Sequence, residues 1–225
     1  MEDGRTADRY RMVREQVAGR GVRDEKVIAA MRKVERHRFV LPEVQEAAYD
    51  DGALPIGLSQ TVSRPHVVGV MLEALRLDTG RERVLDVGTG TGYQAALLAE
   101  MAGLVVSLER HVQLADRARS LLKFLGYENI RVIVRDGSKG HAAHGPFDAI
   151  VVTAVAPDAP PALIEQLANG GRLVMPISDA DERQKLYRFT REGYDVSREE
   201  LLSDVSFVPL VGKYGFRPEE RAIQW

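Results

Sequence analysis

The feature that most constrains the fold is an alternation of short apolar runs with segments of helical period, which begins at Arg83. The apolar runs are RVLDVG, LVVSLER, IRVIVRDG, FDAIVVTAVA and RLVMPI, and the segments between them include TGYQAALLAEMA, VQLADRARSLLKFLG and PPALIEQLANGG. Buried strands that alternate with helices form right-handed βαβ units around a parallel sheet. Two further strand-like runs, QKLYRFTREG and DVSFVPLV, have no helix between them and predict antiparallel pairing at one edge. The sequence therefore predicts an α/β fold with a doubly wound, mostly parallel, seven-stranded sheet.

The first eighty residues have a different pattern. Two amphipathic segments, RYRMVREQVAGRG and DEKVIAAMRKV, predict helices, the second with Asp24 as its N-cap. The stretch LPIGLSQTVSRPH, residues 54–66, fits neither a helix nor a strand period and is interpreted as a loop before a third helix, HVVGVMLEALRL. We expect residues 1–80 to form a helical and loop extension that packs on the sheet edge and across the opening of the ligand site at the carboxyl ends of the strands. Residues 81–225 would form the core, and the two parts would make one structural domain.

Composition excludes several classes of function. The net charge is −2 and the isoelectric point about 6.2, so no broad basic surface for nucleic acid is expected. The absence of cysteine excludes disulfides and thiolate chemistry. The charged start of the chain and the lack of an apolar run of about 20 residues argue against a secretion signal and a membrane span. We expect a cytoplasmic monomer without a metal site, with the histidines other than His66 at the surface.

A glycine-rich turn, VGTGTG, follows the first apolar run of the alternating region. Glycines allow a sharp turn between strand and helix and close approach of a ligand. Gly88, Gly90 and Gly92 have the spacing GxGxG, which differs from the GxGxxG of dinucleotide-binding turns. This turn by itself indicates a tight strand-to-helix connection and a candidate nucleoside site.

Acidic residues end the next two predicted strands. Glu109 lies 21 residues after Gly88, where an acidic side chain can bind both hydroxyls of a ribose. Asp136 and Gly137 end the third strand. Because the carboxyl ends of parallel strands meet at one edge of a sheet, these residues are expected to share a site.

This arrangement resembles the nucleoside pocket of S-adenosylmethionine-dependent methyltransferases. The resemblance implies that S-adenosylmethionine is the cofactor and S-adenosylhomocysteine the product. Its cofactor has no pyrophosphate, and acidic groups suit its sulfonium cation. The resemblance further implies that Glu109 holds the ribose, that Asp136 faces the adenine amine, and that Asp86 supports the glycine loop or binds the amino-acid end of the cofactor. The cofactor-binding residues expected in all are His66, Asp86, Gly88, Thr89, Gly90, Gly92, Glu109, Asp136, Gly137 and Thr153.

The stretch from Ala53 to His66, ALPIGLSQTVSRPH, narrows the resemblance. Followed by VLDVGTGTGYQ, DG, PFDAIVVTAVAP, GGRLVMPI and FVPLVG, it resembles the protein-L-isoaspartate O-methyltransferase family over nearly the whole chain. The Gln-Thr-x-Ser-x-Pro string is the mark of that family. By this resemblance Ser63 is the catalytic hydroxyl, and Thr61 and Gln60 frame the active site. Ser59 departs from the family, which often has glycine at this position.

The implied reaction is methylation of the free α-carboxylate of an isoaspartyl residue in a damaged protein or peptide. A carboxyl of that kind has a pKa of about 3.5 and is already ionised at neutral pH, so no general base is needed. Hydroxyl groups can orient the carboxylate without adding charge. The partners expected are therefore isoaspartyl-containing proteins and peptides.

Two other functions remain open from the sequence. The same core could serve a small-molecule O- or N-methyltransferase, or a protein that binds the cofactor without catalysis. A dehydrogenase is the weakest alternative, because the glycine spacing does not fit.

Overall fold

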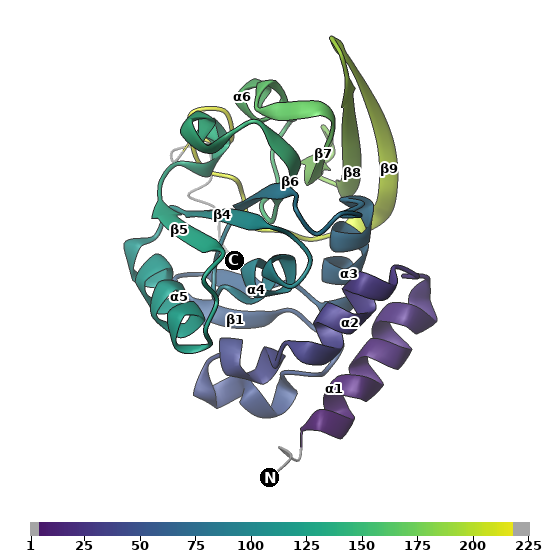
Figure 1. Ribbon diagram of the computed structural model, residues 1–225, viewed down its shortest axis with the longest axis vertical. Coiled ribbons are helices and arrows are strands. Elements are labelled where there is room, and N and C mark those ends of the chain that lie inside the picture. The colour runs from purple at the N-terminus through teal and green to yellow at the C-terminus, as the bar shows by residue number, and fades with distance from the viewer. Residues whose placement is uncertain (1–4, 218–225) are drawn as a thin grey trace.

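The computed structural model describes residues 5–217 and has a seven-stranded sheet at its centre (Figure 1). The strands lie in the order β5-β4-β3-β6-β7-β8-β9. Five are parallel: β3 (Arg83–Val87), β4 (Leu104–Glu109), β5 (Ile130–Val134), β6 (Phe147–Val152) and β7 (Leu167–Ser178). The last two, β8 (Gln184–Glu192) and β9 (Asp195–Val205), pair antiparallel at the edge. The predicted fold class is confirmed, and the structure adds the order of the last two strands.

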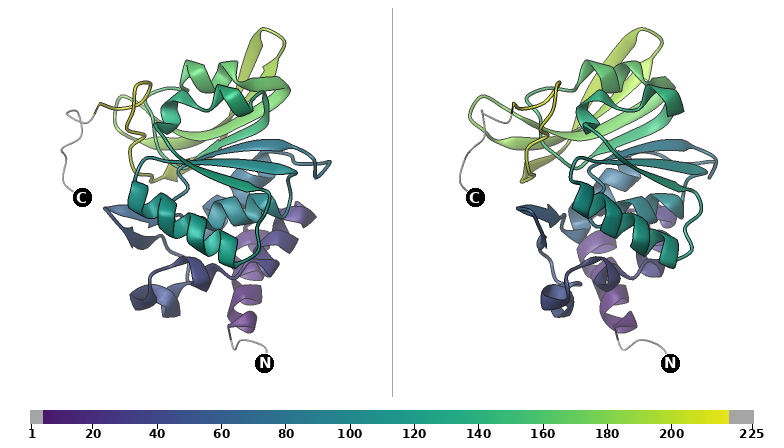
Figure 2. Two further views of the ribbon diagram at one scale, coloured as in Figure 1. Left: turned by 60° about the vertical axis from the view of Figure 1, so that its left-hand side comes forward. Right: turned by 90° about the vertical axis from the view of Figure 1, so that its left-hand side faces the viewer.

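Helices cover both faces of the sheet (Figure 2). One face carries α3 (Pro65–Ala74), α4 (Tyr93–Ala99) and α5 (Val112–Phe124), and the other carries the short helix α6 (Pro161–Glu165). Successive strand residues point to opposite faces: Val84 packs in the first core and Leu85 in the second. The helix predicted from PPALIEQLANGG is only five residues long, because β7 already begins at Leu167.

The N-terminal extension packs on the helical layer. Helix α1 (Thr6–Met12) continues through a π-helical turn and a 3₁₀ turn to Arg20, and α2 (Glu25–Lys33) follows. The Asp24 side chain accepts hydrogen bonds from the backbone N–H of Lys26 (2.8 Å) and Val27 (3.3 Å), which confirms it as the N-cap. Helix α2 contacts α3 and α4 and buries Met31 against them, so the extension lies on this layer rather than on the sheet edge.

His37 lies inside the protein, so the surface position expected for it is wrong. It belongs to a 3₁₀ turn, Arg36–Phe39, and is 8% exposed. Its Nδ1 lies 2.7 Å from the Tyr49 hydroxyl, and this contact keeps a polar ring satisfied in the core.

The stretch interpreted as a loop is a β-hairpin, which corrects the sequence interpretation. Strands β1 (Leu54–Gly57) and β2 (Gln60–Val62) pair antiparallel, and Leu58 and Ser59 form the connection. Both connecting residues have φ of 55°. This is the geometry of a type I′ turn, which normally selects Asn and Gly. The sequence signal was missing because Leu-Ser is not a typical pair for such a turn.

The end of the chain also differs from the prediction. The second edge strand was expected in DVSFVPLV, but β9 runs earlier, from Asp195 to Val205. Residues 207–211 leave the sheet and form only isolated bridges, of Pro209 with Val155 and of Val211 with Phe216. Gly193 and Tyr194 form a two-residue connection, which lets β8 and β9 pair directly as a hairpin.

Within residues 5–217, no helix combines the length and the apolar composition that crossing a bilayer requires.

Replacing Ser59 by glycine should stabilise the fold, because a left-handed conformation costs an L-residue about 1–2 kcal/mol. We expect Ser59→Gly to raise the free energy of unfolding by about 1 kcal/mol in urea denaturation. Ser203→Gly is the matched control: Ser203 lies in β9 without a positive φ, and a strand glycine costs about 0.5–1 kcal/mol. Equal effects of the two substitutions would contradict the assigned strain.

Candidate active site

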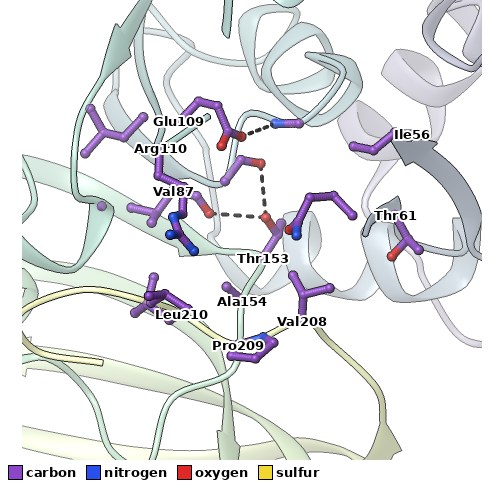
Figure 3. A pocket seen from close by; sticks show the side chains of 16 residues that line it. Ile56, Thr61, Val87, Glu109, Arg110, Thr153, Ala154, Val208, Pro209 and Leu210 are labelled. Atoms are coloured by element: carbon purple, nitrogen blue, oxygen red, sulfur yellow. Dashed lines mark hydrogen bonds between the residues drawn. The ribbon is translucent and has the colours of Figure 1, made fainter. Parts of the chain in front are cut away.

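A cavity opens at the carboxyl ends of the parallel strands (Figure 3). It lies beside β3 and β6, where the chain reverses the direction in which strands are added, and doubly wound sheets bind ligands at such a switch point. Its lining residues are Ile56, Gln60, Thr61, Val87, Gly88, Gly90, Leu108, Glu109, Arg110, Gly137, Thr153, Ala154, Val208, Pro209, Leu210 and Val211. We call this space the main cavity.

Thr153 holds the glycine turn in place at the edge of the main cavity. Its hydroxyl lies 3.2 Å from the carbonyl oxygen of Val87 and 3.1 Å from that of Gly88 and donates to them. Gly88 has φ of 102°, and a Cβ there would lie 2.3 Å from the Thr153 hydroxyl oxygen. Only glycine therefore allows the turn and the β6 end to approach this closely.

The N–H groups of the turn are directed into the protein. Those of Gly88 and Thr89 donate to the Leu108 carbonyl, and that of Gly92 donates to the Thr89 carbonyl. The Gly90 N–H donates to Glu109 Oε2 at 2.9 Å. These four donors are thus used internally, which is the opposite of a phosphate-binding loop.

Glu109 presents a carboxylate to the main cavity and is 6% exposed. Its Oε1 accepts from the His111 N–H at 2.9 Å, so each oxygen has one partner in the protein. A carboxylate has about four acceptor positions, which leaves capacity for two hydroxyls of a ligand. A cavity with this carboxylate, apolar walls and no phosphate cradle fits a nucleoside such as that of S-adenosylmethionine.

Asp86 lies beneath the turn and is fully buried on the α4 side of the sheet. It accepts from Ser107 Oγ at 2.7 Å and from Gln94 Nε2 at 3.1 Å, and Ser107 Oγ lies 2.6 Å from the Thr89 hydroxyl. Burial, opposed by these hydrogen bonds and reinforced by the charge of Glu109, raises the pKa of Asp86 to about 6. Of its two expected roles, the structure places Asp86 in support of the glycine loop and away from the lining of the main cavity.

The segment Phe207–Phe216 crosses the main cavity on the side opposite the glycine turn, and we call it the strap (Figure 3). Asp136 anchors it: Oδ2 accepts from the Lys213 N–H at 3.0 Å, and Oδ1 accepts from the Ser138 N–H and hydroxyl. A Cβ at Gly212 would lie 2.0 Å from Asp136 Oδ1, so this position requires glycine. Burial alone would raise the pKa of Asp136, but the hydrogen bonds from Ser138 and Lys213 keep this pKa below its usual value.

A second cavity adjoins the main one beside the hairpin, and we call it the hairpin cavity. It is lined by Ala53, Ser59, Thr61, Ser63, Arg64, Val67, Thr153, Val205, Ser206, Phe207 and Val208. Thr61, Thr153 and Val208 line both cavities and so form their common wall. Within residues 5–217 the Ser63 hydroxyl makes no hydrogen bond, so it is available to a ligand.

The structure brings most of the expected site residues together. Those that line the main cavity are Gln60, Thr61, Gly88, Gly90, Glu109, Gly137 and Thr153. Ser63 and Thr89 border a smaller recess between the hairpin and the turn. The Gln60 side chain itself donates to the Leu58 and Ser59 carbonyls and so braces the hairpin turn.

Five expected cofactor residues do not line the main cavity: His66, Asp86, Thr89, Gly92 and Asp136. His66 lies near Arg20 and Asp51 instead, and burial together with Arg20 lowers its pKa. Gly92 is the N-cap residue before α4, with φ of 89°, and its missing Cβ makes room for Leu122 of α5. The carboxylate of Asp136 binds the strap, as described above, and its expected position facing an adenine amine stays a prediction. Conversely, sequence reasoning missed Ile56, Arg110 and the strap residues, whose contacts depend on tertiary packing.

The sheet order, with a cavity at its switch point that offers a carboxylate and no phosphate cradle, defines an α/β methyltransferase of the S-adenosylmethionine-dependent class. Comparison with known families narrows this further. The family model for protein-L-isoaspartate(D-aspartate) O-methyltransferase matches residues 8–215, and the chain belongs to that family.

Individual relatives agree over nearly the whole chain. Protein-L-isoaspartate O-methyltransferase 1 of Rhodopseudomonas palustris (strain HaA2) is 50% identical over 219 residues, 96% of this chain and 89% of that protein. The protein-L-isoaspartate O-methyltransferase of Methanoculleus marisnigri is 48% identical over 94% of this chain and 95% of that protein. A solved protein-L-isoaspartate O-methyltransferase superposes with a TM-score of 0.81 at 26% identity, covering 93% of this chain and 67% of that one.

A second solved structure, from Plasmodium falciparum, is assigned as a protein-L-isoaspartate O-methyltransferase and contains S-adenosyl-L-homocysteine. It superposes with a TM-score of 0.76 at 27% identity, covering 89% of this chain and 96% of that one.

Asp86→Asn should stabilise the protein more at high pH than at low pH. The folded pKa of about 6 lies above the ordinary value of 3.8. The contribution of Asp86 to the free energy of unfolding is therefore fully present below about pH 4 and is lost as the pH rises through 6. Asparagine does not titrate, so its advantage over aspartate should grow by about 2 kcal/mol between pH 4.5 and 7.5. Urea denaturation at both pH values measures this. Asp195→Asn, on the exposed start of β9, is the control and should show no such growth; a pH-independent effect at Asp86 would refute the assignment.

Proposed function

We propose that this chain transfers the methyl group of S-adenosylmethionine to the free α-carboxylate of L-isoaspartyl residues in damaged proteins and peptides. Membership of the protein-L-isoaspartate O-methyltransferase family supports the reaction. The observation that carries it in this structure is the common wall of the two cavities, formed by Thr61, Thr153 and Val208. Two ligands bound on either side of these residues would meet beside Ser63.

The main cavity is the proposed cofactor site. Glu109 would accept the ribose hydroxyls, while Gly88, Gly90 and Gly137 would allow the cofactor to approach the backbone. When bound, S-adenosylmethionine supplies an electrophilic methyl group. Asp86, Thr89 and Asp136 would act through other groups, by fixing the turn and the strap.

The hairpin cavity is the proposed substrate site, with Ser63 and Thr61 as the groups that bind the substrate carboxylate. That carboxylate has a pKa of about 3.5 and is ionised at neutral pH, so the hydroxyls need only orient it and exclude water. Neutral donors hold the oxygen without strongly stabilising its charge before reaction. Gln60 would contribute by bracing the turn that carries Thr61.

The product would begin a repair sequence. A methyl ester has a better leaving group than a free carboxylate, so the neighbouring backbone nitrogen can displace methanol and form a succinimide. Hydrolysis of this ring gives normal aspartate in part. These later steps are spontaneous and require no group of this chain.

We further propose that the protein acts as a cytoplasmic monomer without nucleic acid. Its edge strand β9 carries Asp195, Arg198, Glu199, Glu200 and Asp204, and charged edge strands resist pairing with another chain. The cytoplasmic location is supported by the proposed cofactor, which is a nucleoside, and by the proposed substrates, which are aged intracellular proteins.

The function is tested by transfer of labelled methyl groups to a peptide that contains isoaspartate and to the same peptide with ordinary aspartate. We expect label in a base-labile ester of the first peptide only. Equal labelling of both peptides, or labelling of an extract metabolite with neither peptide modified, would instead indicate a small-molecule methyltransferase.

Two substitutions should separate methyl transfer from cofactor binding. Ser63→Ala removes a hydroxyl that binds a charged oxygen, so we expect kcat for the peptide to fall about 10- to 100-fold with cofactor Kd nearly unchanged. Glu109→Gln weakens the acceptor proposed for the ribose, so cofactor Kd should rise by about tenfold or more. Peptide kinetics and isothermal titration with S-adenosylhomocysteine measure the two effects.

Matched controls exist for both substitutions. Ser206→Ala removes another hydroxyl from the hairpin cavity, and Glu128→Gln removes an exposed carboxylate away from the main cavity. Neither should change kcat or Kd by more than about twofold. Equal losses of kcat and affinity at Ser63 would remove its proposed role.

A further inference from the structure

Arg36 is a charged side chain in the interior that no step above uses. It is 0% exposed, and within residues 5–217 its guanidinium has no carboxylate within ion-pair distance. Burial lowers its pKa from the usual value. A buried charge without a counter-ion is costly, so its contacts indicate what the side chain does.

The contacts of Arg36 join three separate segments. Nε donates to the Ala48 carbonyl at 2.9 Å, and Nη2 donates to the Ser63 carbonyl at 2.9 Å. The guanidinium carbon lies 5.0 Å from the centre of the Tyr93 ring, in a cation–π arrangement. Tyr93 is the first residue of α4, directly after the glycine turn. One rigid group therefore links the hairpin loop to the start of the helix behind the main cavity.

The position of Ser63 shows why this link is needed. Val62 before it is held by pairing with Leu54, and Pro65 after it begins α3. Ser63 and Arg64 connect these two elements, and among the side chains of residues 5–217 only that of Arg36 donates a hydrogen bond to the Ser63 carbonyl. Fixing the carbonyl fixes the peptide plane, which limits the direction in which the Ser63 hydroxyl can point.

We propose that Arg36 is a positioning residue for methyl transfer, which holds the Ser63 backbone in register with the glycine turn. This inference rests on the proposed function of Ser63. Lysine has the same charge but a single terminal nitrogen, so it cannot reproduce the two bonds of the planar guanidinium to the Ala48 and Ser63 carbonyls. Replacing Arg36 by lysine therefore tests whether methyl transfer needs the two hydrogen bonds or only a positive charge at this position.

The test compares Arg36→Lys with Arg9→Lys in the full-length protein. Arg9 is also buried in the N-terminal layer, but its Nε donates to the Arg32 carbonyl at 2.6 Å and its Nη1 lies 3.5 Å from Glu35. We expect Arg36→Lys to lower kcat for the isoaspartyl peptide at least tenfold more than Arg9→Lys. The Kd for S-adenosylhomocysteine should stay within threefold of wild type, with both variants assayed well below their melting temperatures.

Two results would overturn the proposal: turnover of Arg36→Lys within threefold of Arg9→Lys, or a loss of cofactor affinity as large as the loss of turnover. Wild-type protein is measured in the same assay, so that failure of the Arg36 proposal can be told from failure of the proposed function. An inactive wild type would refute the methyltransferase proposal instead.

A second variant serves if Arg36→Lys does not fold. Replacing the Ser63–Arg64 amide by an ester makes the Ser63 carbonyl a poorer acceptor while Arg36 stays in place. Turnover should then fall severalfold at unchanged cofactor affinity, and unchanged turnover of a folded ester variant would equally overturn the proposal.

Discussion

The site depends on one contact, between the Thr153 hydroxyl and the glycine turn. Strands β3 and β6 lie side by side at the centre of the sheet, and the Thr153 hydroxyl donates to the carbonyl oxygens of Val87 and Gly88 at the point where both strands end. This contact fixes the edge of the main cavity and the wall that it shares with the hairpin cavity. The N–H groups of the same turn donate to Leu108 and Glu109 of β4, so the turn is held from both neighbouring strands.

Polar groups around the cavities form two layers with different tasks. Thr61, Ser63 and Glu109 face the space where ligands would bind. Asp86, Ser107, Asp136 and Arg36 lie behind them and hold the turn, the strap and the hairpin loop. Because the substrate carboxylate is ionised before it binds, the proposed chemistry depends on alignment, and alignment depends on the groups in the second layer. This explains why so many buried polar side chains surround a site that needs no general base.

Much of the site could be predicted because its residues follow strands. Gly88, Glu109 and Gly137 each lie at or just beyond the end of a parallel strand, and the topology of a doubly wound sheet brings such ends together. Asp86 and Asp136 were placed at the correct edge by the same argument, but their side chains bind other parts of the protein. Strand position determines where a Cα lies; the partner of a carboxylate depends on which other segment packs against it.

The sequence by itself determined the α/β class, six of the seven strands and the acidic and glycine residues at the strand ends, because periodicity and turn chemistry are local properties. Only the tertiary structure decided that Leu58 and Ser59 close a hairpin, that the strap crosses the main cavity, and that Arg36 reaches Ser63. These features join residues far apart in the chain: 27 positions separate Arg36 from Ser63, and 77 separate Asp136 from Lys213. No local pattern encodes such contacts, since they form only when the core brings the segments together.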